Sequence, residues 1–182
     1  ADVPPLLFLA MRFTFVALPL VFFVPRPKSD GRTVVAVGSF MSLGQFSLLY
    51  IALELGMPAG LASLVLQAQV IFTIVIAAIV LKESPSRRQV VGASLGTAGL
   101  VLVVVAHGAT APVVPVLVML GAATSWAIGN VIARQAGISS GFSLVVWSAL
   151  VVPLPALGLS LVVDGGGEVG HALTHLSAVA IA

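Results

Sequence analysis

The sequence contains very little charge. Of its 182 residues, 8 are Lys or Arg and 6 are Asp or Glu, whereas 59% are hydrophobic. In an ordinary globular domain about a quarter of the residues are charged, so this chain could not cover its own surface in water. The composition, with a mean hydropathy of +1.20, therefore predicts a membrane protein.

Several kinds of chemistry lack the residues that they need. The absence of cysteine excludes disulfides and thiolate metal sites, and no phosphate-binding pattern of an ATPase is present. The long apolar runs carry no Asp, Glu or His near their centres, where an intramembrane protease or metalloenzyme would need them. The few basic residues lie between the apolar runs and form no basic face for nucleic acid. We therefore expect no catalytic residues, no metal, no cofactor and no nucleic-acid partner.

Six apolar runs have the length of a membrane span. A bilayer core about 30 Å thick requires about 20 helical residues. The runs cover residues 4–24, 33–53, 60–81, 89–106, 113–133 and 142–163, and a shorter one covers 176–182. The predicted fold is therefore an all-α polytopic membrane protein with six complete transmembrane helices and the start of a seventh. Because the last run is too short to span and no signal peptide precedes the first, we expect a fragment of a longer protein.

The basic residues predict the orientation in the membrane. Loops after the first, third and fifth runs contain Lys or Arg, whereas those after the second, fourth and sixth contain none. Short loops rich in Lys and Arg stay in the cytoplasm. We therefore predict a multi-pass protein of the bacterial inner (plasma) membrane, with cytoplasmic loops at 25–32, 82–88 and 134–141.

The turn at 82–88 has the residues of a helix start. Ser86 and Gln89 have the spacing of a capping box, and Glu83 lies near the helix N-terminus, where a negative charge is favoured. Glu83 is thus expected to anchor the turn, with proton coupling as the alternative role. Beyond this turn, small residues recur at close to helical spacing and predict faces for helix packing in lipid. These are Gly92, Gly96 and Gly99 in one run, and Gly121, Ser125 and Gly129 in the next.

Polar residues inside the apolar runs are the candidates for function, because lipid cannot satisfy them. Arg12 could extend to the outer surface or bind a carboxylate in a cavity. Gln67 and Gln69 point in different directions on a helix, so at most one is expected to line a cavity. Trp126 and Ser148 could line it or simply pack, and Arg134 fits an anchor at the membrane surface. The expected lining of a substrate cavity is Arg12, Gln45, Gln67, Gln69, Trp126, Asn130 and Ser148.

A weak internal repeat links the first and sixth runs. Pro19 follows Arg12 by seven residues, and Pro155 follows Ser148 by the same interval. Helices five spans apart cross the membrane in opposite directions, as an inverted repeat of five helices requires. With amides, hydroxyls and aromatic rings but no central acids, the inventory favours secondary transport of a neutral or zwitterionic molecule.

Three groups of residues carry a resemblance to a known family. The segment from Gly56 to Gln69, followed by Thr73, resembles the fourth helix of EamA-type transporters in the drug/metabolite transporter superfamily. The spacing of Leu81, Glu83, Ser86, Gln89 and Gly92 is similar to the turn and helix that follow in that family. Further segments match at 4–13, 23–28, 125–130, 146–150 and 164–165, of which the last three resemble the exporters of cysteine and O-acetylserine. The chain departs from the family at Lys82, commonly Gly there, and at the proline after Glu83.

The resemblance implies ten helices in two inverted repeats of five, with a central substrate site and alternating access. Residues 1–106 would then hold helices two to five of the N-terminal repeat. Residues 107–182 would hold helices six, seven and the start of eight of the C-terminal repeat. The implied partners are a small amino acid or derivative, the lipid bilayer, a proton as coupling ion and a second copy in a homodimer. The alternatives are export of another metabolite or drug, and a non-transporting membrane scaffold.

Overall fold

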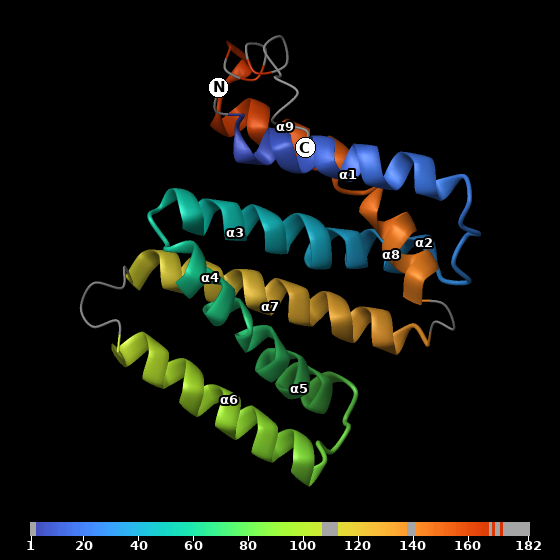
Figure 1. Cartoon of the computed structure of the whole chain (residues 1–182). Helices are drawn as coiled ribbons and strands as arrows, with labels where there is room; N and C mark the ends of the chain where they lie inside the picture. Colours follow the sequence, from blue (N-terminus) through green and yellow to red (C-terminus); the bar gives the residue numbers. More distant parts are fainter. Residues whose placement is uncertain (1–2, 107–112, 138–140, 168, 170–171, 173–182) are drawn as a thin grey trace.

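The helices of the chain lie roughly side by side, with α7 in the middle (Figure 1). This computed structural model describes residues 3–106, 113–137, 141–167, 169 and 172. No β-strand occurs within those residues. The elements are α1 (Pro5–Val21), α2 (Gly31–Val37), a π-helical segment η1 (Gly38–Gly44), α3 (Gln45–Glu54), α4 (Ala59–Leu66), α5 (Ala68–Val80), α6 (Arg87–Ala106), α7 (Val113–Gln135), α8 (Gly141–Ala149) and α9 (Pro153–Val163).

The predicted apolar runs correspond closely to helical stretches. Four stretches are long and apolar enough to cross a membrane, namely Gly31–Glu54, Ala59–Val80, Val113–Gln135 and Gly141–Val163. Two further runs form α1, with 17 residues, and α6, with 20 residues. The all-helical polytopic fold is thus confirmed, while the count of six spans and the inverted repeat remain predictions.

The sequence predicts each of the four long stretches as one continuous helix. In the structure, three of them are interrupted near their midpoints. The first changes to π-helix over η1, between α2 and α3. The second breaks at Gln67, where two consecutive hydrogen bonds span three residues, from Gln67 N to Leu64 O and from Val70 N to Gln67 O, each 3.1 Å long. The third breaks before Pro153, which has no N–H to continue a helix and instead starts α9.

Helix α7 forms the most extensive packing contacts of any helix in the described part of the bundle. It packs against α3 and η1 on one side and against α4 and α5 on the other. Buried Met119 and Ala122 of α7 belong to one apolar cluster with Ala52, Leu61 and Val65. Helix α1 packs mainly against α9, and α6 packs on α5 at the edge of the bundle.

The basic segments share one end of the bundle. The connection from α1 to α2, the turn from α5 to α6 and the C-terminus of α7 all lie at that end (Figure 1). Antiparallel neighbours produce this arrangement, because loops that follow alternate helices return to the same side. Which face of the membrane this end occupies remains a prediction.

Candidate functional site

Close contacts set the register of α7 against η1 and α3. A Cβ added to Gly129 would lie 2.9 Å from the backbone nitrogen of Met41, so only a glycine allows this approach. One turn along, Gly44 contacts Ser125, and farther along Gly121 faces Leu48. The segments are therefore antiparallel, and Gln45 lies at the level of Ser125.

On the opposite side of α7, helices α4 and α5 run parallel to it. Leu61 and Val65 join the same apolar cluster as Met119 and Ala122. Toward the other end, Ala77 and Arg134 line one cavity, an offset of 57 residues (134 minus 77). Because α5 and α7 run in the same direction, this offset places Gln69 at about the level of Trp126. Gln45 and Gln69 thus reach the same level of α7 from its two sides.

The two glutamines carry acceptors without partners. Gln45 is 5% exposed and Gln69 is half-buried, and the Oε1 atom of each is buried with no hydrogen-bond partner. A buried amide without a partner costs several kcal/mol in an apolar medium, or about 1–3 kcal/mol by protein mutational data. Such groups favour a polar ligand or water at this depth. We call Gln45, Gln69 and Trp126, with Asn130 one turn farther along α7, the amide layer; Trp126 and Asn130 are half-buried.

One hydroxyl in the same region was missed as a candidate. Ser47 is 8% exposed, and its Oγ has no hydrogen-bond partner. It lies two residues after Gln45, on a different side of α3. A lone serine between apolar residues gives little signal in a sequence, because its hydroxyl can usually bond the preceding turn of its own helix. Only the structure shows that this one does not.

Arg12 and Ser148 lie away from the amide layer. The Arg12 guanidinium rests 5.5 Å from the centroid of the Phe46 ring, a cation–π geometry. Arg12 also lines a groove of about 290 Å³ between α1 and α8. Ser148 is buried and donates its hydroxyl hydrogen to Val145 O, 3.0 Å away in its own helix. In this conformation the structure does not bring either residue to the glutamines.

Gln67 faces a different part of the surface. It is exposed and lines a groove of about 310 Å³ between α4–α5 and α6. The opposite wall contains Gly92, Gly96 and Gly99, and a Cβ added to any of them would meet nothing within 4 Å. Within the described residues the small-residue face of α6 is therefore open, whereas Gly121 and Gly129 on α7 are in contact with a neighbour.

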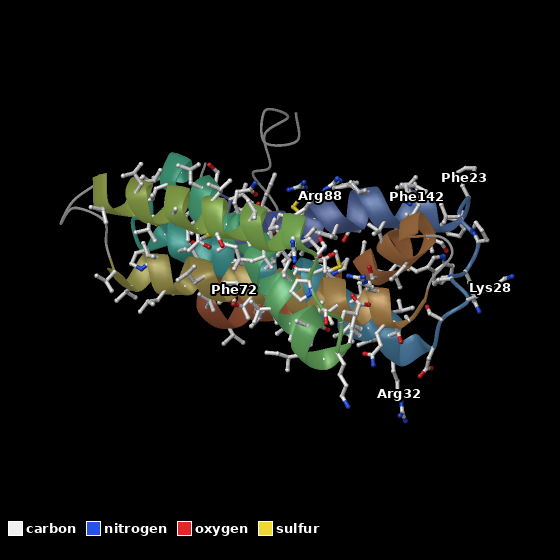
Figure 2. All side chains as sticks on the ribbon, turned by 90° about the horizontal axis from the view of Figure 1, so that it is seen from below. Phe23, Lys28, Arg32, Phe72, Arg88 and Phe142 are labelled. Carbon is white, nitrogen blue, oxygen red and sulfur yellow. The ribbon has the colours of Figure 1, made fainter. Side chains whose placement is uncertain are left out.

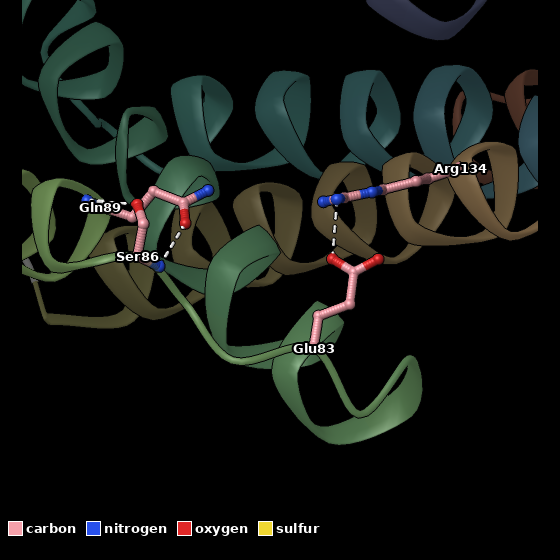
Figure 3. Close-up of polar contacts among 4 residues, drawn as sticks. All are labelled: Glu83, Ser86, Gln89 and Arg134. Atoms are coloured by element: carbon pink, nitrogen blue, oxygen red, sulfur yellow. Dashed lines mark hydrogen bonds and ion pairs between the residues drawn. The ribbon is translucent and has the colours of Figure 1, made fainter.

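The turn from α5 to α6 is anchored by polar contacts (Figure 3). Ser86 N donates to Gln89 Oε1 at 2.8 Å, and Gln89 N donates to Ser86 Oγ at 3.3 Å, as expected of a capping box. Glu83 forms an ion pair with Arg134 at 2.7 Å, with the two side chains 45% and 57% exposed. Arg134 therefore links the end of α7 to this turn.

Lys82 in the same turn has a left-handed backbone, with φ of 54°. This conformation is costly for a residue with a Cβ and is the natural choice for glycine. It gives a physical reason for the glycine that the family commonly has at this position.

No group of three or more His, Cys, Asp or Glu side chains that could hold a metal ion exists among the residues described. The polar groups at membrane depth are amides, hydroxyls and the guanidinium of Arg12. Such a site can bind a small polar molecule by hydrogen bonds.

Comparison with known proteins gives one family. The model of the EamA-like transporter family matches residues 1–105. A protein of Salmonella typhimurium (strain LT2) named "probable amino-acid metabolite efflux pump" is 40% identical over 98% of this chain. A protein of Escherichia coli (strain K12) with the same name is 37% identical over 99% of the chain. The chain spans 62% of the length of each of these relatives, and no solved structure matches it.

Proposed function

Since the chain belongs to the EamA-like transporter family and is a multi-pass membrane protein, we propose that it functions in a secondary transporter that exports small amino acids or their derivatives. The cargo is of the cysteine or O-acetylserine type, and it crosses the bacterial inner membrane by alternating access. The names of the two relatives, amino-acid metabolite efflux pumps, support this cargo class.

The observation that carries the proposal is the pair of unpartnered amides at one level of α7. In the proposed site Gln45 and Gln69 bind the polar groups of the substrate, and Trp126 and Asn130 complete the layer from α7. A ligand that hydrogen-bonds to either glutamine removes the cost of burying the acceptor of that glutamine. Lipid tails cannot do so, and the site therefore selects a polar molecule.

The sequence left open whether Gln67 or Gln69 lines the cavity, and the geometry favours Gln69. Gln67 lines the groove beside α6, whereas the acceptor of Gln69 is buried and lies on α5, which packs against α7. Arg12 remains the proposed partner of the substrate carboxylate, in a state in which α1 and α8 separate. Ser148, on α8, would be exposed by the same movement.

The proposed architecture is two inverted repeats of five helices, divided as 1–106 and 107–182, with α1 and α6 as spans too. Three interrupted spans support it, because discontinuous helices near the midplane are typical of transporters with inverted repeats. Proton coupling is part of the proposal. Glu83 either takes part in it or serves only as the structural anchor of its turn.

The test is an efflux assay on the full-length protein, expressed in cells loaded with labelled cysteine or O-acetylserine. Gln69→Met replaces the amide by an apolar side chain of similar length, and Gln45→Met does the same in α3. Gln67→Met is the matched control, two residues from Gln69 but outside the amide layer. We expect wild type and the control to accelerate efflux over empty vector, and both amide-layer variants to lose most of this gain while keeping their expression level.

The outcomes separate the alternatives. Wild-type efflux equal to that of the empty vector for both labels would remove this cargo and favour another metabolite or a drug. If the Gln45→Met and Gln69→Met variants lost efflux only because their expression level fell, the result would favour the non-transporting scaffold. Equal loss in Gln67→Met and Gln69→Met would contradict the placement of the site beside α7.

A further inference from the structure

The connection between α1 and α2 is held against α8 by specific contacts. The indole Nε1 of Trp147 donates to Val24 O at 3.2 Å, and the hydroxyl of Ser143 donates to Pro25 O. The guanidinium of Arg26 lies 5.1 Å from the centroid of the Trp147 ring. An otherwise free basic side chain is thus positioned over an aromatic ring at the end of the bundle.

Basic residues without carboxylate partners surround this point. The connection contains Arg26 and Lys28 and one acid, Asp30, and Arg32 follows in the first turn of α2. All four side chains are exposed. Throughout the described ranges, the ion pair found is that of Glu83 with Arg134, so none of these three cations is neutralised by a carboxylate there. Their charge is available to an anion from outside the chain.

Exposed aromatic and aliphatic side chains lie next to these cations. Phe22, Phe23 and Phe142 are 80%, 85% and 65% exposed. Phe23, Phe142 and Lys28 gather at one end of the molecule (Figure 2). From Phe142 the groove between α1 and α8 extends along Val145, Ala149, Leu20 and Val16, with a volume of about 290 Å³. Apart from Arg12, the side chains that line the groove are apolar.

We infer that this end of α1 and α8 is a binding site for an anionic phospholipid. The phosphate binds Arg26 and Lys28, and one acyl chain occupies the α1–α8 groove. Cations at the end of spanning helices attract anionic lipids, aromatic rings favour the headgroup level, and the stacked guanidinium of Arg26 keeps its N–H groups free for phosphate oxygens. The acyl chain is what distinguishes this ligand from a free phosphate ion.

Fluorescence quenching by brominated lipids tests the site, since the chain has only two tryptophans. Trp126→Phe leaves Trp147 beside the site, and the full chain is reconstituted in mixtures of brominated phosphatidylglycerol or brominated phosphatidylcholine with unlabelled lipid. We expect phosphatidylglycerol to quench Trp147 with a preference of about thirtyfold, because each of the two cations near the membrane surface contributes about 1 kcal/mol. Arg26→Gln with Lys28→Gln should reduce the preference to about one.

Two controls make the result specific. Arg87→Gln with Arg88→Gln removes two cations from the first turn of α6, at the same end of the bundle, and should leave the preference unchanged. In Trp147→Phe the remaining Trp126, on α7, should show no lipid preference. Equal quenching of Trp147 by the two lipids would overturn the inference. A preference that is lost equally in both double variants would also overturn it, because this result indicates general attraction of anionic lipid to the basic surface. A preference that is abolished by added inorganic phosphate would overturn it as well, because this result indicates a site for a free anion.

Discussion

Gly38→Ala is expected to destabilise the protein, because the backbone of α8 occupies the space that a methyl group needs. A Cβ on Gly38 would overlap the carbonyl oxygen of Ser148 and lie 2.9 Å from the Cβ of Val151. Carbon atoms in contact are normally about 3.5–4.0 Å apart, so the shortfall to Val151 alone is roughly 0.6–1.1 Å. Neither obstacle can be moved by a rotamer change, since one is backbone and the other is a Cβ atom.

The size of the effect follows from two opposing terms. Overpacking of this kind costs about 1–3 kcal/mol, whereas replacing Gly by Ala inside a helix gains up to about 1 kcal/mol. Gly92→Ala is the matched control, because it makes the same change inside α6, where a Cβ would meet nothing within 4 Å. The helix term is then common to both variants, and Gly38→Ala should be the less stable one by about 1–3 kcal/mol.

The assay is reversible unfolding of the chain by a denaturing detergent in mixed micelles, followed by circular dichroism. The free energies of unfolding of the two variants and the wild type are compared under the same conditions. If Gly38→Ala proved as stable as Gly92→Ala, the close approach of η1 to α8 would be refuted.

Variants at three further positions test other contacts by the same unfolding assay. Ser125→Ala removes the hydroxyl that donates to Phe40 O at 2.7 Å and should cost about 0.6–1.7 kcal/mol, the range for such bonds in membranes; no change would contradict the bond. Ser86→Ala should cost about 1 kcal/mol by removing the N-cap, whereas Ser86→Asp, also a good N-cap, should be close to wild type. Glu83→Gln should cost less than about 1 kcal/mol because the ion pair with Arg134 is exposed, and a loss above about 2 kcal/mol would show that the pair is shielded from water.

Local features were predictable from the sequence because they depend on neighbouring residues. The run 113–133 corresponds to α7, Val113–Gln135, and the run 89–106 to α6, Arg87–Ala106. Hydropathy over about 20 residues suffices to locate such a helix. The bonds between Ser86 and Gln89 likewise involve residues three apart. The alternation of loops with and without Lys or Arg could likewise be read directly from the sequence.

The helix interruptions were not predictable in this way. Nothing in the residues of η1 by themselves marks a π-helix, and a proline such as Pro153 can equally kink a helix or end it. The π-helical segment begins at Gly38, which closely approaches Ser148 near the break between α8 and α9. This interruption therefore reflects tertiary packing, whereas the break at Pro153 also has a local cause, its missing N–H.

By itself, the sequence determined the solvent in which this protein folds, the positions of its helices and the turn between α5 and α6. Only the tertiary structure decided that Gln45 and Gln69 reach one level of α7 from its two sides, that Gln67 lines the groove beside α6 and that Arg12 stacks on Phe46. The reason is that a membrane helix is apolar on all sides, so its periodicity does not show which face meets a neighbour. Packing of small residues decides that face, and contacts such as Met41 with Gly129 join helices that are far apart in the sequence.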